Sequence, residues 1–531
     1  MPLSDLPTEL ILMIGDAQTS LSRPPFANDV CSLSALAQTC RRFHKILNPY
    51  LYRFNARYQG SSALVWAVRN ARRRTAEIAL DNKADVHVSL DKRGFPVDSK
   101  TRQPGLRPDI PSHHYWFYPP CRLTNSGLLT QAFMELERLC YTEATESYAG
   151  TNIPCADMVA KYNPVIELLI DRGIDIERAD IECQSINEWS VRLTTLHRAA
   201  HGGYDTLVQL LLDKGANVDS LVARSNYTPL FYAVQNDYDC FNKTPEGDPW
   251  KLQWATRKQR VVRMLLARGA DVNARACNGS TPLHYAVYCP SLVRILLGYG
   301  ADATAGISDD GTPLHRAIYH LPCGPPSFNC HREHRRVNTA IKSTIRVLLE
   351  HGAAVDERDK GTTALHLASR YLEMEVAQIL LEFGANVNAR GPDGWSPIQY
   401  ALHASAGEFN SRALANARTI SRMLIGFGAN VNSKTEMGLA PLHQAAAYGD
   451  LELVRALIDH GAVVQERDVY GFSPLQYAVE GLNGTLGKYA RRFPYVSGRG
   501  VSYERRFAIP SCYEGVANFL LLYEGSRLLT E

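Results

Sequence analysis

The chain has 531 residues, and its 57 basic and 54 acidic side chains leave a formal net charge of only +3. Such nearly equal numbers of basic and acidic side chains do not indicate a nucleic-acid-binding or membrane-surface protein. The 12 cysteines include no Cys-x-x-Cys pair, no charged-then-apolar signal segment opens the chain, and no apolar run approaches the roughly 18 residues of a membrane helix. These features predict an intracellular protein of the reducing cytoplasm or nucleus, without a membrane span and with nucleic acid disfavoured as a partner.

Residues 1–58 are predicted to form a small helical domain. Its first helix has Pro7 in the first turn, where proline is tolerated, and Leu10 and Ile14 on one face. A second apolar face and a short third helix follow, ending before Pro49. The order of motifs is Leu-Pro-x-Glu-Leu, then Leu-x-x-Leu-Ala-x-x-Cys-Arg-x-Phe, then Pro-x-Leu-Tyr.

This order of motifs resembles the F-box. The resemblance implies docking on the Skp adaptor of a cullin-RING ubiquitin ligase core, although the connector between Ile14 and Leu33 is longer than the family usually shows. Alternatively, these helices only cap the open end of the repeats that follow, because terminal repeats need a polar cover. The residues that the resemblance assigns to adaptor binding are Leu6, Pro7, Leu10, Ile14, Leu33, Leu36 and Phe43.

Residues 61–192 are predicted to contain two degenerate copies of a helix-pair repeat. Leu64 and Ala67 take the signature positions in the first copy, and Leu129 and Ala132 take them in the second. Between them, residues 91–126 are rich in proline and aromatic residues. We expect this stretch to be an elaborated finger.

Residues 193–531 contain about eight clearer copies. The segment 362–389 is typical: Thr363 is a good N-cap, Leu365 and Ala368 share one helix face, and Gly384 stands where a helix commonly ends in a left-handed residue. The signature hexapeptides are TTLHRA from Thr194, TPLFYA from Thr228, TPLHYA from Thr281, TPLHRA from Thr312, TALHLA from Thr363, SPIQYA from Ser396, APLHQA from Ala440 and SPLQYA from Ser473.

This two-part motif resembles the ankyrin repeat, whose period is about 33 residues and whose signature is TPLHxA. The resemblance implies an all-α solenoid of helix-turn-helix repeats with short β-turn fingers. A single copy cannot bury its apolar faces, so copies must stack. We count ten repeats, two of them degenerate, behind the F-box-like domain.

The longer repeats alternate with shorter ones. Their extra residues fall between the first and second helix, near 236–254, 321–337, 404–413 and 482–512. We therefore expect a row of loops along one edge, one for every second repeat. Surface drift of tolerated loops is the alternative explanation.

Aromatic residues recur at two positions of the repeat and predict a partner-binding face. Ankyrin proteins use the fingers and the inner first helices as their contact surface, and Tyr and Trp are common at binding hot spots. We expect about half of these residues to pack between repeats instead. The candidates are Tyr227, Trp395 and Phe472 before the signature, and Tyr288, Tyr319, Tyr371 and Tyr448 after it.

Catalytic, metal and cofactor sites are not predicted. His320, Cys323, Cys330, His331 and His334 have the residue types that bind zinc, but their spacing matches no common zinc module. The arginine- and aromatic-rich residues 491–507 could bind single-stranded nucleic acid, yet a solvated loop packing on the last repeat is favoured. The signature histidines recur at one slot, which indicates a structural role. HExxH, GxSxG and kinase patterns are absent from the sequence.

Together these patterns predict a non-catalytic substrate receptor of a Skp-cullin-F-box ligase, holding an unknown protein substrate on the ankyrin face. The main alternative is an ankyrin scaffold or inhibitor without ligase partners. A third alternative is an enzyme with its site in residues 91–126 or near Cys323.

Overall fold

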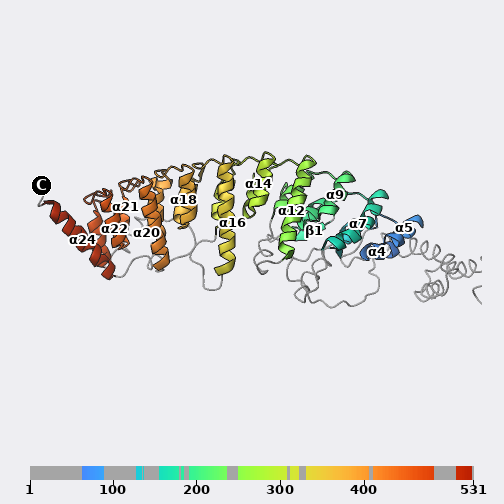
Figure 1. Cartoon of the computed structure of the whole chain (residues 1–531), viewed down its shortest axis with the longest axis horizontal. Helices are drawn as coiled ribbons and strands as arrows, with labels where there is room; N and C mark the ends of the chain where they lie inside the picture. Colours follow the sequence, from blue (N-terminus) through green and yellow to red (C-terminus); the bar gives the residue numbers. More distant parts are fainter. Residues whose placement is uncertain are drawn as a thin grey trace, which may run out of the picture. The chain divides into compact units, whose positions relative to one another are not determined.

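The computed structural model describes residues 62–88, 127–133, 135–136, 155–178, 181–184, 190–235, 249–307, 311–321, 331–405, 411–483 and 510–528. These residues form two compact units, which divide between Cys277 and Asn278. Both units consist of helix pairs joined by turns (Figure 1). Residues 1–58, with the whole F-box-like segment, lie outside the described residues.

Unit 1 contains four helix pairs in its described part. The first helix of the second pair covers helical residues 128–133 and 135–136. The elements are α4 (Ser62–Arg69), α5 (Arg73–Asp81), α7 (Cys155–Asp171), β1 (Ile181–Gln184), β2 (Ser190–Leu193), α8 (Thr195–Gly202), α9 (Asp205–Asp213), α10 (Pro229–Val234) and α12 (Pro249–Ala267).

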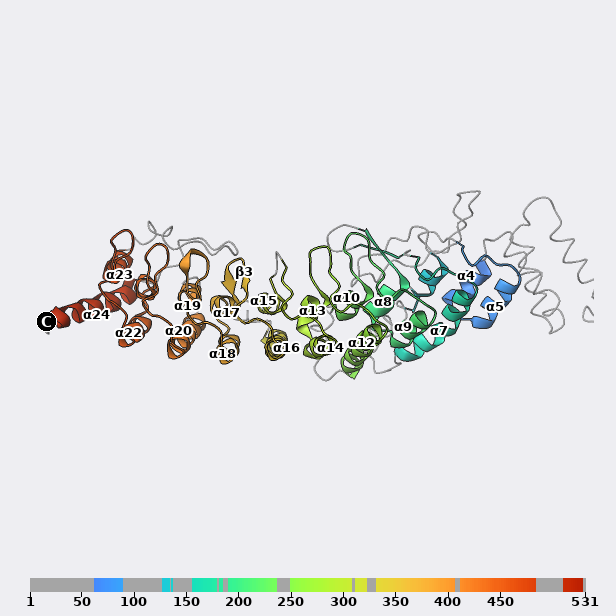
Figure 2. The same ribbon diagram turned by 90° about the horizontal axis from the view of Figure 1, so that it is seen from above.

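Unit 2 contains six helix pairs in its described part. First and second helices form two rows when this unit is seen from above (Figure 2). The elements are α13 (Pro282–Tyr285), η3 (Ala286–Tyr288), α14 (Pro290–Gly298), α15 (Pro313–Tyr319), α16 (His331–Glu350), β3 (Arg358–Asp359), β4 (Thr362–Thr363), α17 (Ala364–Arg370), α18 (Met374–Glu382), η4 (Pro392–Gly394), α19 (Pro397–Ser405), α20 (Ser411–Gly426), α21 (Pro441–Ala447), α22 (Leu451–Asp459), α23 (Pro474–Leu482) and α24 (Pro510–Leu528).

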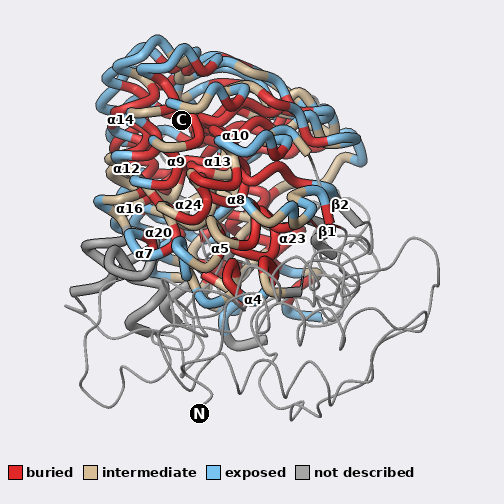
Figure 3. Tube along the Cα trace, turned by 90° about the vertical axis from the view of Figure 1, so that its right-hand side faces the viewer, coloured by how far each residue is buried: buried red, intermediate tan, exposed pale blue. Residues whose placement is uncertain are grey.

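The core of unit 2 is one continuous apolar cluster that runs through its helix pairs. Leu365, Ala368 and Leu380 are fully buried in it, as the 3.6-residue spacing of apolar positions predicts. Second helices end in a left-handed glycine, with φ of +83° at Gly384. The turns that follow lie at the exposed edge (Figure 3). The predicted repeat architecture is therefore confirmed.

Second helices alternate in length along the chain. The short ones, α5, α9, α14, α18 and α22, have 9 residues each. The long ones, α7, α12, α16, α20 and α24, have 17, 19, 20, 16 and 19 residues. The predicted insertions thus fall between first and second helices, and part of each inserted segment extends the second helix at its N-terminal end.

Two short antiparallel strand pairs qualify the all-α prediction. β1 pairs with β2, with Ile181 opposite Leu193, and β3 pairs with β4, with Arg358 opposite Thr363. The second pair is closed by Lys360 and Gly361, whose φ angles are +49° and +81°. Two successive left-handed residues match the natural twist of a hairpin, so this finger closes as a β-hairpin.

Candidate functional site

Five first helices carry a signature histidine, and four of these rings lie within hydrogen-bond distance of a backbone carbonyl of the next finger: His197, His284, His366 and His443. His366 is fully buried, and its Nδ1 accepts the N–H of Thr363 at 3.1 Å. Because Nδ1 is an acceptor, the ring proton lies on Nε2, which donates to the carbonyls of Ala389 and Trp395, both at 3.1 Å. The hydroxyl of Thr363 lies 2.8 Å from Nδ1, so this N-cap works through the histidine.

Burial holds these histidines in the neutral form. It lowers the pKa of His197 and of His366 to about 4, against hydrogen bonds to backbone carbonyls that raise it. The pKa values of His315 and His443 are lowered by the same cause. A neutral imidazole wedged between two backbone segments has a structural role, as the recurrence of the slot predicts.

The candidate binding site is a set of partly exposed side chains at the C-terminal ends of the first helices of unit 2. We call it the inner-helix surface. Tyrosine and arginine dominate it, and each member comes from the last turn of a first helix or from the residue after it. Its members are Tyr285, Tyr288, Arg316, Tyr319, Arg370, Tyr371, His403 and Tyr448.

Neighbouring repeats orient these side chains by direct contacts. The guanidinium of Arg316 on α15 lies 4.5 Å from the ring centroid of Tyr285 on α13. The rings of Tyr288 and His320 lie 5.3 Å apart. Such cation–π and ring contacts are each worth about 0.5–1.5 kcal/mol and fix ring orientation.

Tyr319 is held by the next finger. Its hydroxyl donates to Oδ2 of Asp359 at 2.7 Å, and Asp359 is only 3% exposed. Burial raises the pKa of Tyr319, and the carboxylate of Asp359 raises it further, so the phenol stays protonated. The hydroxyl of Tyr319 is thus neutral and fixed in position, which suits a contact surface.

A second polar contact crosses from α19 to the end of α21. Nδ1 of His403 lies 2.8 Å from the hydroxyl of Tyr448. On α17, the guanidinium of Arg370 lies 5.9 Å from the ring centroid of Tyr371. Rings, cations or imidazole are therefore held in place in five consecutive repeats, those of α13, α15, α17, α19 and α21.

Three of the predicted contact residues do not belong to this surface. Trp395 is only 2% exposed, because its indole packs edge-on against Tyr400 and His403 at 5.7 and 5.3 Å. Phe472 is partly buried against Tyr477, with ring centroids 5.6 Å apart. We therefore assign Trp395 to the core and Phe472 to finger packing.

Tyr227 belongs to unit 1 and packs inside its own repeat. Its ring stacks on Phe231 with centroids 5.0 Å apart, and its carbonyl lies 3.2 Å from Nε2 of His197. Tyr288, Tyr319, Tyr371 and Tyr448 thus remain as the predicted aromatic residues on the inner-helix surface.

Four members of the inner-helix surface were not predicted as contact residues: Tyr285, Arg316, Arg370 and His403. Tyr285 and Arg316 both follow the signature histidine directly, at the variable position of TPLHxA. Comparing this variable position between adjacent repeats could have found Tyr285 and Arg316, because a tyrosine ring and a guanidinium can stack there only when neighbouring repeats carry one each. His403 lies one turn beyond the slot that Gln399 occupies.

Several predicted features lie wholly or partly outside the described residues. They include the adaptor-binding residues Leu6, Pro7, Leu10, Ile14, Leu33, Leu36 and Phe43, and Cys323 and Cys330 of the zinc candidate. Within the described ranges, no cluster of three or more His, Cys, Asp or Glu side chains could hold a metal ion. No described helix is both long and apolar enough to cross a membrane.

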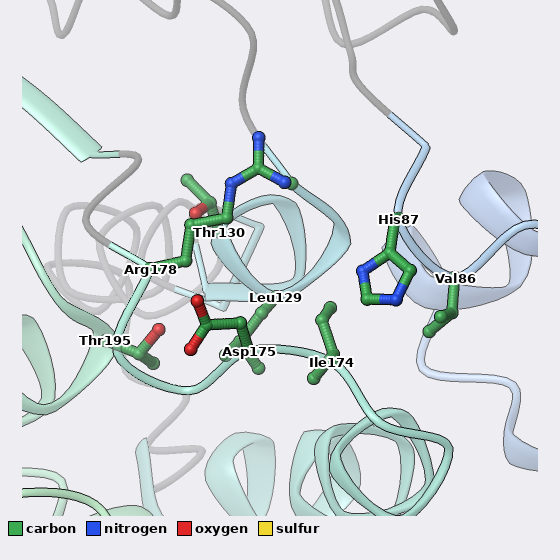
Figure 4. A pocket seen from close by; sticks show the side chains of 9 residues that line it. Val86, His87, Leu129, Thr130, Ile174, Asp175, Arg178 and Thr195 are labelled. Carbon is green, nitrogen blue, oxygen red and sulfur yellow. The ribbon is translucent and has the colours of Figure 1, made fainter.

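A small depression in unit 1 lies among residues from both degenerate repeats. Val86 and His87 line one side, and Asp175 and Ile174 line another (Figure 4). The space of about 10 Å³ that is open to the centre of a water molecule holds about one water. The depression therefore offers no room for an organic substrate.

Comparison with known proteins identifies the repeat. The family description "Ankyrin repeats (3 copies)" matches residues 156–243, 252–325 and 410–486, and "Ankyrin repeats (many copies)" matches residues 348–401. The mouse B-cell lymphoma 3 protein homolog is 34% identical over 94 residues, which are 18% of this chain and 16% of that protein. A putative ankyrin repeat protein of fowlpox virus, FPV244, is 30% identical over 137 residues, which are 24% of this chain and 19% of that protein.

The matched segments therefore span less than a fifth of these relatives' own lengths. Among solved structures, the crystal structure of the ankyrin repeat domain of Bcl-3 is 27% identical, with a TM-score of 0.36, covering 48% of this chain and 94% of that one.

Proposed function

Because the chain is an ankyrin-repeat protein, we propose that it is a non-catalytic protein-binding module whose partner contacts the inner-helix surface. The observation that carries this proposal is the run of oriented tyrosine rings paired with cations or imidazole. Tyrosine and arginine are the side chains that contribute most at interfaces. Rings already held by Arg316 and His403 lose little conformational freedom on binding, which favours affinity.

We propose further that the module is the substrate receptor of a Skp-cullin-F-box ubiquitin ligase. The support is the sequence of residues 1–58, with its Leu-Pro-x-Glu-Leu start and its Cys-Arg-x-Phe end. In this arrangement residues 1–58 bind the Skp adaptor and the inner-helix surface binds the protein to be ubiquitinated. Ubiquitin transfer itself is the work of partner subunits.

Co-purification with the Skp adaptor tests the ligase role. The full chain should form a one-to-one complex that is lost in the double variant Leu6→Ala, Pro7→Ala. A third protein, beginning at Ser61, should fold and fail to bind. If the full chain does not bind the adaptor, the N-terminal helices are a cap and the protein is an ankyrin scaffold or inhibitor.

A double substitution tests the inner-helix surface independently of the ligase role. In cells, the double variant Tyr371→Ala, Tyr448→Ala should no longer cross-link to most of the proteins that cross-link to the wild-type chain. Arg294→Ala, an exposed change on α14, is the matched control and should retain them. Tyr371 packs against the core through its ring, so the double phenylalanine variant, which keeps both rings, should keep the melting temperature. An unchanged set of cross-linked proteins in the folded alanine variant contradicts the proposed surface.

A further inference from the structure

One position of the repeat differs between the two units: the residue just before the left-handed residue that follows a second helix. We call this position the closing slot. In unit 1 it holds a cation in three successive repeats: Arg172, Lys214 and Arg268. Each cation pairs with the last residue of the preceding second helix. Nη2 of Arg172 lies 2.8 Å from Oδ1 of Asp81, and Nζ of Lys214 lies 2.6 Å from Oδ1 of Asp171. Arg268 pairs with Asp213 in the same way.

These pairs form a ladder of alternating charge along the ends of the second helices. A cation near a helix C-terminus is favoured by the partial negative charge there, while a carboxylate at the same place is disfavoured. Each cation of unit 1 thus offsets both the helix end and the neighbouring carboxylate. The pairs are exposed and individually weak, but they leave this edge charge-balanced and without exposed rings.

Unit 2 replaces the cations of the closing slot with rings. The slot holds Tyr299, His351, Phe383, Phe427 and His460 in turn. Tyr299, Phe383 and Phe427 are 48%, 36% and 49% exposed. Exposed large apolar side chains repeated on one edge indicate an interaction site.

The acidic half of the ladder is retained at the two phenylalanines. Glu350 ends α16 before Phe383, and Glu382 ends α18 before Phe427, just as aspartates precede the cations of unit 1. Among the described residues, the side chain of Glu350 forms no ion pair or hydrogen bond. Glu382 accepts a hydrogen bond from Gln378 at 2.9 Å and lies 3.7 Å from Arg346. Both carboxylates stand at helix C-termini, where a cation would stabilise them.

Two histidines flank the phenylalanines. Nδ1 of His351 lies 2.8 Å from the carbonyl of Val347, and Nδ1 of His460 lies 2.8 Å from that of Ala456. A carbonyl can only accept, so Nδ1–H donates and the ring is tied back to its own helix. The apolar part of the edge therefore consists of Phe383 and Phe427, in adjacent repeats whose second helices α18 and α20 are in contact.

We propose that this edge, from His351 to His460, binds a basic amphipathic helix of a partner protein. Its lysine or arginine side chains take the place of the cations that the closing slot lacks, beside Glu350, which has no ion pair among the described residues, and beside Glu382, whose partner Arg346 lies 3.7 Å away. The same cations reach the faces of Phe383 and Phe427, where a cation–π contact adds to the ion pair.

The geometry of repeats suits a helix lying across them. Packed helices stand about 8–10 Å apart, and seven residues of an α-helix rise about 10.5 Å. Side chains seven residues apart therefore meet the same position in successive repeats. First and second helices are antiparallel, so this edge lies at the opposite end of the helix pairs from the inner-helix surface. Both surfaces can be occupied together.

Charge distinguishes this partner from other occupants. An anionic membrane would be repelled by Glu350, Glu382 and Asp459, all exposed along the edge. A second copy of the chain offers the cations of unit 1, but these are already paired with aspartates. A partner that brings its own basic residues meets neither obstacle.

Fluorescence anisotropy on the full chain tests the proposal. The probe is a labelled 18-residue helical peptide with leucine–arginine pairs seven residues apart. The double variant Phe383→Ala, Phe427→Ala should bind it at least tenfold more weakly. Phe383→Lys with Phe427→Lys should abolish binding, because the lysines supply the internal cations themselves. Tyr470→Ala removes an aromatic ring that is 50% exposed on a finger and should leave binding unchanged.

Three outcomes overturn the proposal. They are no measurable binding of the basic peptide to the wild-type chain, equal binding by the double alanine variant, and equal binding of an acidic peptide with the same leucine spacing. Sedimentation velocity provides a further test. A dimer that disappears in the double alanine variant would assign the edge to a second copy of the chain, against the proposal.

Discussion

Replacing His366 by glutamine should remove part of the acid sensitivity of unit 2. The pKa of His366 is lowered from 6.5 to about 4 in the folded state, chiefly by burial. Between these two values the unfolded chain binds a proton that the folded chain does not. Stability is therefore lost as the pH falls below about 6.5, and the loss is complete near pH 4. From pH 7.5 to 5.0 this single group costs about 2 kcal/mol.

Glutamine is the matched replacement because the chain uses it in the same slot. In α19, Oε1 of Gln399 accepts the N–H of Ser396 at 3.0 Å, and Nε2 donates to the carbonyl of Leu439 at 2.8 Å. His366→Gln should therefore cost less than about 1 kcal/mol at pH 7.5, while His366→Ala, which leaves these backbone groups without partners, should cost about 2–4 kcal/mol.

Urea unfolding at pH 7.5 and 5.0 measures the effect. Repeat proteins open segment by segment, so hydrogen exchange in α17 and α18 should be followed in parallel. Relative to wild type, His366→Gln should lose about 2 kcal/mol less between the two pH values. The same pH dependence in both proteins would refute the reasoning, as would a large cost of the glutamine at pH 7.5.

Five further substitutions test the packing, each followed by urea unfolding at pH 7.5. Gly384→Ala should cost about 1 kcal/mol from its left-handed backbone alone, because no atom lies within 4 Å of the new Cβ; Gly438→Ala should cost more, since its Cβ would approach a backbone carbon of the next finger to 3.1 Å. Asp450→Ala should cost about 2–4 kcal/mol. Asp450 is only 4% exposed, its side chain caps α22, and its Oδ1 lies 3.0 Å from Nη2 of Arg418 on α20. The exposed neighbour Glu452→Ala should cost less than about 0.5 kcal/mol, and similar costs at both positions would contradict the burial argument. Trp395→Ala should cost about 3–5 kcal/mol, as for a core residue, and a cost near zero would return Trp395 to the contact surface.

The repeat architecture could be predicted because its determinants are local. The signature places an N-cap, a small alanine and a glycine stop within one segment of about 33 residues. Each of these acts on its own helix, so Gly384 and Thr363 could be interpreted without knowledge of neighbours. The alternation of second-helix lengths follows from the spacing of the signatures for the same reason.

The contact surface could be predicted only in part. Tyr319 and Trp395 looked alike in sequence, as aromatic residues next to the signature. Tyr319 stays partly exposed because Asp359 of the next finger holds its hydroxyl. Trp395 is buried because Tyr400 and His403 cover its ring. Asp359 lies 40 residues beyond Tyr319, in the next repeat, where a local pattern does not reach. Tyr400 and His403 lie on α19 of the repeat that Trp395 opens, but only the packing of the folded chain turns their rings toward the indole.

The sequence by itself determined the helix pairs, their caps, their glycine stops and the order of long and short repeats, because each depends on residues a few positions apart. Tertiary structure decided which rings face solvent and which cations find a carboxylate. The sequence shows that the closing slot holds Lys214 in a repeat of unit 1 but Phe383 and Phe427 in two repeats of unit 2. The meaning of this difference depends on the carboxylate of the preceding repeat, about 30–50 residues away, which only the stacking of helices brings to the same edge.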